Sequence, residues 1–204
     1  MMTAKEADVR RRLSVVVVLL EAASLTLLFS LIRLRIVSDT VGILLLCLLP
    51  IAFGLHVTEE FILPGGFIAW DNVFRPQFTE TAGSFYVKVN TYPGIFAFLV
   101  VLGAFDYRGG YGAGVASWLV FATFMSWNAI FHVRGAIRTR RYSPGMVTGL
   151  ALFWPLMVAG YAHFMAAGIV SWWIAAACIA GALVIQPILD LIKGRGRKET
   201  GNRD

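Results

Sequence analysis

Apolar blocks, separated by short polar or glycine-containing connections, divide this chain along its whole length. They lie at about residues 13–32, 41–63, 84–105, 113–133, 144–166 and 171–192. Most are about 20 residues long, the length at which an α-helix crosses the hydrocarbon layer of a bilayer. The pattern therefore predicts an all-α fold, a polytopic membrane helix bundle with about six transmembrane helices.

The charged residues agree with this class of protein because they are few and grouped. They make up 15% of the chain, against about 25% in a typical soluble domain. Basic residues gather beside apolar blocks, at 10–12, 134–141 and 193–198, as they do in the cytoplasmic flanks of membrane helices. We therefore attribute the net charge of +6 to basic residues that set the orientation of the chain in a lipid bilayer. Nucleic-acid binding is not expected.

These blocks also predict the domain organisation. Residues 1–12 form a cytoplasmic tail, 13–192 a single transmembrane domain, and 193–204 a basic flexible tail. An even number of helices places both termini on one side, and the basic clusters predict that this side is cytoplasmic. A signal peptide is the alternative for the first block, but its apolar run continues to Ile32, which is too long for one.

The second block ends in three polar side chains that a membrane helix would not turn towards lipid. His56, Glu59 and Glu60 fall within an arc of roughly 100° on one helix face. Ionisable side chains inside a membrane are costly and commonly mark functional sites. Their spacing suits either a metal site or a proton relay between histidine and carboxylate.

A second polar pair lies at the same expected depth in the fourth block. Asn128 and His132 are four residues apart and share a helix face. His56 and His132 both lie near the inner ends of helices that run in the same direction, within ~10 Å of the cytoplasmic boundary. The two motifs are therefore predicted to meet in one site near that face.

The same depth argument sorts the remaining polar residues of the membrane blocks. The carboxyl of Glu21 is expected near His56, because a lone carboxylate in the membrane costs at least ~2.5 kcal/mol. His163 lies at the outer end of its block, roughly 20 Å from this layer, and is left out of the site. Four residues are added to the inner layer: Glu21, Thr148, Gln186 and Asp190.

The connection over residues 65–84 mixes aromatic with charged side chains and is expected to be irregular. Phe67, Trp70, Asp71 and Arg75 are residue types that favour the headgroup level of a membrane. The segment is either a lid over the end of the second helix or an ordinary interfacial loop.

Three interpretations of the polar layer remain open. His56, Glu60 and His132 match the ligand preferences of zinc, iron or manganese. The same groups without a metal could perform general acid–base chemistry. A polar network that only joins the helices is the third interpretation. The sequence contains no phosphate-binding loop and no hydrolase or dinucleotide-binding motif.

Several motifs together resemble a family of bacterial membrane proteins named for their HXXEE motif. The resemblance covers about residues 50–155, through the segments 56–60, 128–132, 138–141 and 142–145 with Thr148. It implies an integral protein of the bacterial inner membrane. It also adds Tyr142 to the candidate residues, but it supplies no defined reaction.

The leading expectation is a membrane-embedded enzyme with a metal-assisted or acid–base site near the cytoplasmic face. Its substrate is expected to be a lipophilic small molecule, lipid-like or isoprenoid, and its reaction hydrolysis, oxidation or isomerisation. The alternatives are a small proton-coupled transporter or an accessory membrane subunit. The candidate catalytic residues are Glu59, Glu60, Asn128 and Tyr142.

Overall fold

The computed structural model describes residues 39–76 and 111–200, together with a few scattered positions between 7 and 26. The described ranges are helical and contain no strand, which confirms the all-α prediction. Their helices are α2 (Thr40–Phe61), α3 (Phe67–Phe74), α5 (Tyr111–Thr139), α6 (Met146–Thr148), the π-helical turn η2 (Gly149–Phe153), α7 (Trp154–Ala166) and α8 (Trp172–Thr200).

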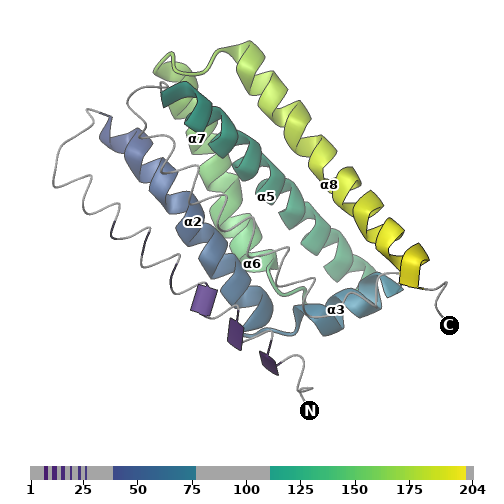
Figure 1. Cartoon of the computed structure of the whole chain (residues 1–204). Helices are drawn as coiled ribbons and strands as arrows, with labels where there is room; N and C mark the ends of the chain where they lie inside the picture. Colours follow the sequence, from purple (N-terminus) through teal and green to yellow (C-terminus); the bar gives the residue numbers. More distant parts are fainter. Residues whose placement is uncertain are drawn as a thin grey trace.

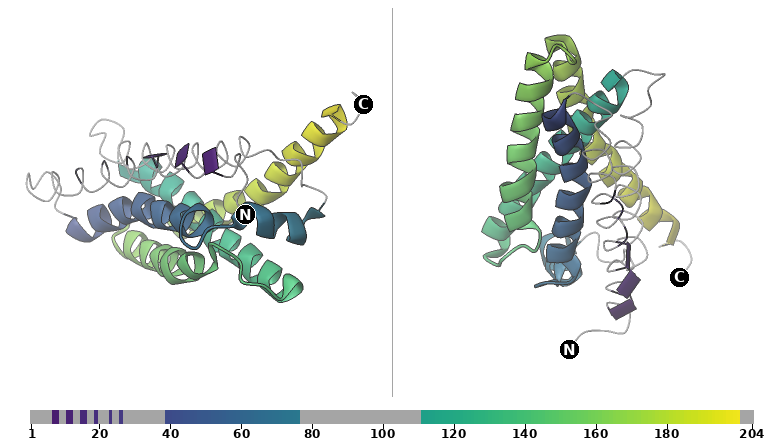
Figure 2. Two further views of the ribbon diagram at one scale, coloured as in Figure 1. Left: turned by 90° about the horizontal axis from the view of Figure 1, so that it is seen from below. Right: turned by 90° about the vertical axis from the view of Figure 1, so that its left-hand side faces the viewer.

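The long helices form a bundle in which α5 is central. It packs against α8, α7, η2 and α2, while α2 also packs against α7. Figure 1 shows that α2, α5 and α8 run in one direction and that α6–η2–α7 returns in the other. The short helix α3 lies across one end of the bundle, where α2 ends (Figures 1 and 2). This arrangement brings the last turns of α2 and α5 beside the start of α6.

Three helical segments are long and apolar enough to cross a membrane: Thr40–Phe61, Gly114–Thr139 and Met146–Ala166. A shorter apolar stretch, Trp172–Ile185, belongs to α8. Large apolar side chains such as Trp154, Val158 and Trp173 are exposed on α7 and α8, as expected of surfaces that face lipid. The described helices thus fit an integral membrane protein. Apart from single positions in 13–32, the spans expected at 13–32 and 84–105 lie outside the described residues.

Three predicted boundaries differ from the structure. α5 continues to Thr139 instead of ending near Val133, because arginine is a good helix former and cations favour a helix C-terminus. α8 continues to Thr200, so the expected basic flexible tail is helical as far as that residue. Part of the connection expected to be irregular forms α3.

Close approach of α7 to α5 depends on Gly160. A Cβ atom added there would lie 2.2 Å from Cζ3 of Trp118, which is fully buried. Gly160→Ala is therefore expected to lower the free energy of unfolding by about 1–3 kcal/mol, as overpacking does. Melting temperatures in detergent measure this effect. Gly181→Ala is the matched control, because a Cβ at Gly181 meets nothing within 4 Å, and an unchanged or higher melting temperature is expected for it.

Candidate functional site

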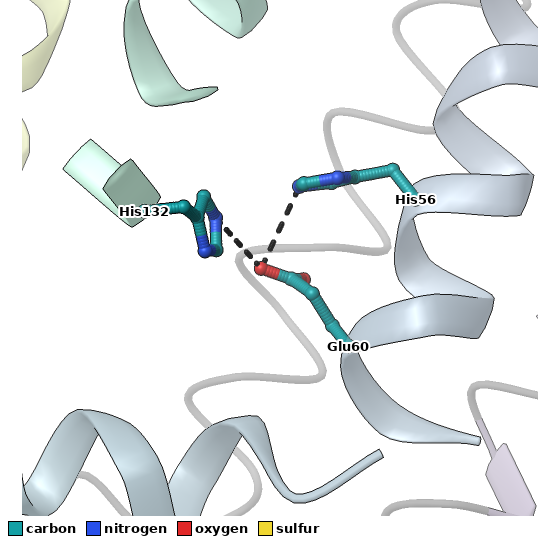
Figure 3. A group of neighbouring side chains, drawn as sticks. All are labelled: His56, Glu60 and His132. Carbon is teal, nitrogen blue, oxygen red and sulfur yellow. Dashed lines mark ion pairs between the residues drawn. The ribbon is translucent and has the colours of Figure 1, made fainter. Parts of the chain in front are cut away.

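Three buried side chains converge where α2 and α5 come together. His56 and Glu60 lie one turn apart near the end of α2, and His132 faces them from α5 (Figure 3). The Glu60 Oε1 atom is 3.6 Å from His56 Nε2 and 3.4 Å from His132 Nε2. All three residues are at most 4% exposed. The structure thus brings together the three residues that the sequence singled out as metal ligands.

The neighbours of each imidazole favour a proton on Nδ1. Thr148 Oγ1 donates to Glu59 and lies 3.0 Å from His56 Nδ1, so the hydroxyl accepts the Nδ1–H of His56. His132 Nδ1 lies 2.8 Å from Ser143 Oγ, to which it can donate a proton, and the amide nitrogen of Asn128 lies 3.3 Å from His132 Nε2. With the proton on Nδ1, each histidine has its lone pair on Nε2, the nitrogen nearer to Glu60.

Three acceptor atoms facing one another in a buried place repel unless a proton or a cation lies between them. The three candidate ligand atoms all lie within 4.8 Å of one another. A tetrahedral zinc site with bonds of about 2.1 Å separates its ligand atoms by about 3.4 Å. The observed separations from Glu60 of 3.4 and 3.6 Å agree with that value. The donor set and its spacing thus fit a divalent cation.

Glu59 occupies a different environment from Glu60, although the two are neighbours. Its Oε1 accepts from the hydroxyl of Tyr142 and from Val147 N at 3.1 Å, and its Oε2 accepts from Thr148 N at 2.7 Å and from Thr148 Oγ1. The carboxylate thereby caps the start of α6, where backbone N–H groups lack helical partners. The expected catalytic role of Glu59 stays a prediction, and this geometry favours a positioning role.

Tyr142 is half exposed, and its hydroxyl reaches inwards to Glu59. Burial of the hydroxyl and the hydrogen bond to the Glu59 carboxylate raise the pKa of Tyr142 to about 12. The phenol therefore keeps its proton at neutral pH and acts as a donor to Glu59. Its expected role in orienting substrate stays a prediction.

The α5–α6 connection, residues 140–145, closes one side of the cluster through Gly145. This residue has a φ of +95°, and an added Cβ would lie 2.8 Å from His56 Cε1, 2.9 Å from Glu60 Cγ and 2.9 Å from His132 Cε1. A side chain does not fit there. Sequence reasoning gave no role to Gly145 or to Ser143, and the only signal for them was their place in the Tyr-Ser-Pro-Gly segment.

Aromatic side chains enclose the two imidazoles. From α3, Trp70 stacks on His132 with ring centroids 5.8 Å apart and Phe67 lies 5.6 Å from it. From η2, Phe153 meets His56 edge-on at 5.4 Å. Of the two interpretations of residues 65–84, the described part therefore resembles a lid over the end of α2. Single π-helical turns such as η2 commonly occur at functional sites.

The remaining sequence-predicted residues fall in different places. Asn128 and Thr148 belong to the cluster through their bonds to the imidazoles. His163 does not: its Nε2 lies 2.9 and 3.0 Å from the carboxylate oxygens of Asp39, at the opposite end of α2. Glu21 and the side chains of Gln186 and Asp190 lie outside the described part of the chain. The expected contact between Glu21 and His56 thus stays a prediction.

Comparison with known proteins gives one result. The model of a family described as proteins of unknown function with an HXXEE motif matches residues 47–160. No match is found among curated proteins or among solved structures. The matched region is more than half of the chain and contains the whole cluster with the α5–α6 connection. The chain therefore belongs to the HXXEE-motif family of proteins of unknown function.

Proposed function

We propose that this protein is a membrane-embedded metalloenzyme whose divalent cation is held by His56, Glu60 and His132. The observation that carries the proposal is the convergence of two Nε2 atoms on one carboxylate oxygen in a buried site. In the six-helix arrangement with both termini in the cytoplasm, this site lies near the cytoplasmic face. The protein would then reside in the bacterial inner membrane.

The number of ligands favours catalysis over a purely structural role. Structural zinc sites are usually closed by four protein ligands, whereas catalytic sites have three and keep one position for water or substrate. Three candidate ligands are present among the described residues. Two histidines and one glutamate are a ligand set used by hydrolytic zinc enzymes.

The two separations measured from Glu60 favour zinc over iron. Two histidines and one carboxylate can also hold iron on one face of an octahedron, where bonds of about 2.1 Å place neighbouring ligand atoms about 3.0 Å apart. The separations of 3.4 and 3.6 Å are closer to the tetrahedral value. Hydrolysis of a lipophilic substrate is therefore preferred to oxidation or isomerisation.

The residues of the chain have separate tasks in this proposal. When bound, the cation supplies Lewis-acid polarisation and a more acidic water. Thr148 and Ser143 orient the two imidazoles through their Nδ1 atoms, and such outer partners tune metal ligands. Asn128, whose amide is 3.3 Å from His132 Nε2, is placed to orient a substrate or water. The aromatic side chains of α3 exclude bulk water.

A proton-coupled transporter is supported less well by the described residues. Transport of protons needs a polar path between the two faces of the membrane. Between Asp39 and His56, the buried face of α2 is mostly apolar, with Leu46, Leu49 and Phe53 in the core. α2 itself thus offers polar groups at its two ends and an apolar interval between them.

Elemental analysis of the purified protein tests the metal proposal. Protein expressed in medium that contains zinc, iron and manganese together is expected to retain about one zinc ion per chain, because three buried ligands bind it. About one iron ion per chain instead of zinc would favour oxidation over hydrolysis as the reaction. Metal content no higher than that of a Glu60→Ala variant would contradict a metal site at these residues.

A further inference from the structure

Four arginines are exposed at the end of the bundle that holds the site: Arg134, Arg138, Arg140 and Arg141. Within the part of the chain that the structure describes, none of them forms an ion pair. The guanidinium of Arg138 lies 5.8 Å from the Phe74 ring centroid, so Arg138 belongs to the α3 side. Arg140 and Arg141 lie in the α5–α6 connection, whose next residues contact the site.

The backbone of Arg140 is unusual for its residue type. It has a φ of +53° and is the one described residue other than glycine with a positive φ. This left-handed conformation ends α5 at Thr139, a task that glycine or asparagine usually performs because a Cβ atom is unfavourable there. An arginine at a position where its backbone is unfavourable motivates a search for a function of its side chain.

An exposed apolar stripe begins directly after this connection. Val147, Leu150, Trp154 and Val158 are between 37 and 59% exposed and recur at helical spacing along α6, η2 and α7. Their span of 11 residues corresponds to about 16 Å, which is comparable to one leaflet of the hydrocarbon layer. Two cationic side chains thus stand at the end of an apolar strip of single-leaflet length.

We propose that Arg140 and Arg141 bind the phosphate of an anionic lipid whose acyl chain lies along Val147, Leu150, Trp154 and Val158. Guanidinium groups pair with phosphate through two parallel hydrogen bonds, and the stripe complements the chain of the same molecule. This lipid class supplies the substrate, so the proposal rests on the proposed enzyme function. A water-soluble phosphate compound would use the arginines but not the stripe.

The position of the two arginines connects this lipid to the site. Arg141 is followed by Tyr142, which donates to Glu59, and by Ser143, which bonds to His132. Two residues span at most about 7 Å. A headgroup held by the side chain of Arg141 therefore lies close to Tyr142 and Ser143, the two residues that bond to Glu59 and His132.

Competitive lipid binding tests the proposal. The purified protein is mixed with equal amounts of phosphatidylglycerol and phosphatidylcholine, and the lipids retained are counted by native mass spectrometry. The parent protein is expected to prefer phosphatidylglycerol. Arg140→Gln with Arg141→Gln should reduce that preference about tenfold, because two charge-assisted contacts are lost. Millimolar inorganic phosphate should not displace the lipid, and displacement by it would overturn the lipid assignment.

Arg134→Gln with Arg138→Gln is the matched control, since it removes the same charge from the neighbouring turns of α5. It should change the lipid preference less than about twofold, because general attraction of anionic lipid is spread over the whole basic surface. An equal loss of lipid preference in the two double variants would show that only this general attraction is measured, and it would overturn the proposal. An unchanged lipid preference in both double variants would also overturn it.

Metal analysis of the same samples separates this proposal from the enzyme proposal. The double variant of Arg140 and Arg141 is expected to keep its metal while losing the lipid preference. His132→Ala is expected to lose metal while keeping the lipid preference. Retention of the lipid preference without any metal in the parent protein would refute the metalloenzyme and leave the lipid site standing.

Discussion

Replacing His132 by alanine is expected to abolish metal binding, whereas replacing His163 by alanine leaves it unchanged. His132 Nε2 is one of three converging ligand atoms. Loss of an outer-shell partner alone reduces metal affinity about 10- to 100-fold, so loss of a ligand should reduce it by more than about 100-fold. Zinc stoichiometry after dialysis against a weak chelator measures the difference.

His163 is a suitable control because it is also a hydrogen-bonded histidine in the same bundle. Its Nε2 bonds to Asp39, 17 residues before His56, which corresponds to about 25 Å along α2. His163→Ala should lower the melting temperature through the lost link between α7 and α2 without changing the metal content. Equal metal loss from both folded variants would show that the site lies elsewhere.

Replacing Gly145 by alanine is expected to abolish metal binding with every candidate ligand still present. The added methyl group would lie under 3.0 Å from atoms of His56, Glu60 and His132 at once. These side chains are buried, so relief requires the connection or the ligands to move, and a shift of a few tenths of an ångström spoils a bond length of about 2.1 Å. Metal stoichiometry and melting temperature are measured together.

Gly66→Ala separates the contact from the backbone strain. Gly66 has a φ of +91°, close to that of Gly145, but a Cβ there meets nothing within 4 Å. Both variants therefore share a backbone penalty of about 1–2 kcal/mol, and only Gly145→Ala disturbs the cluster. Metal lost to the same extent from both variants would assign the effect to general destabilisation.

The meeting of His56 with His132 could be predicted because membrane helices have few degrees of freedom. Helix rise and hydrocarbon thickness fix the depth of a residue in the membrane. Two polar motifs at the same depth avoid contact with lipid by facing each other. The same rule separated His163 from the cluster. The predicted six spans and the position of Glu21 stay predictions, because they depend on segments outside the described residues.

The tasks of Ser143, Gly145 and Glu59 could not be predicted in the same way. They depend on the path of the α5–α6 connection, and two left-handed residues, Arg140 and Gly145, redirect that path. Periodicity gives the heights and faces of helical residues but says nothing about a connection. It also could not assign different tasks to Glu59 and Glu60, since both belong to the polar face of α2 and their partners lie in other segments.

The bonds of Glu59 also have a consequence for the order of events during synthesis. Its donors, Tyr142, Val147 and Thr148, are translated 83 to 89 residues after it. The carboxylate therefore leaves the ribosome long before any of these partners exists. Until they arrive, it must be protonated, hydrated or kept out of the hydrocarbon. α2 can therefore reach its final position only after α6 has been synthesised.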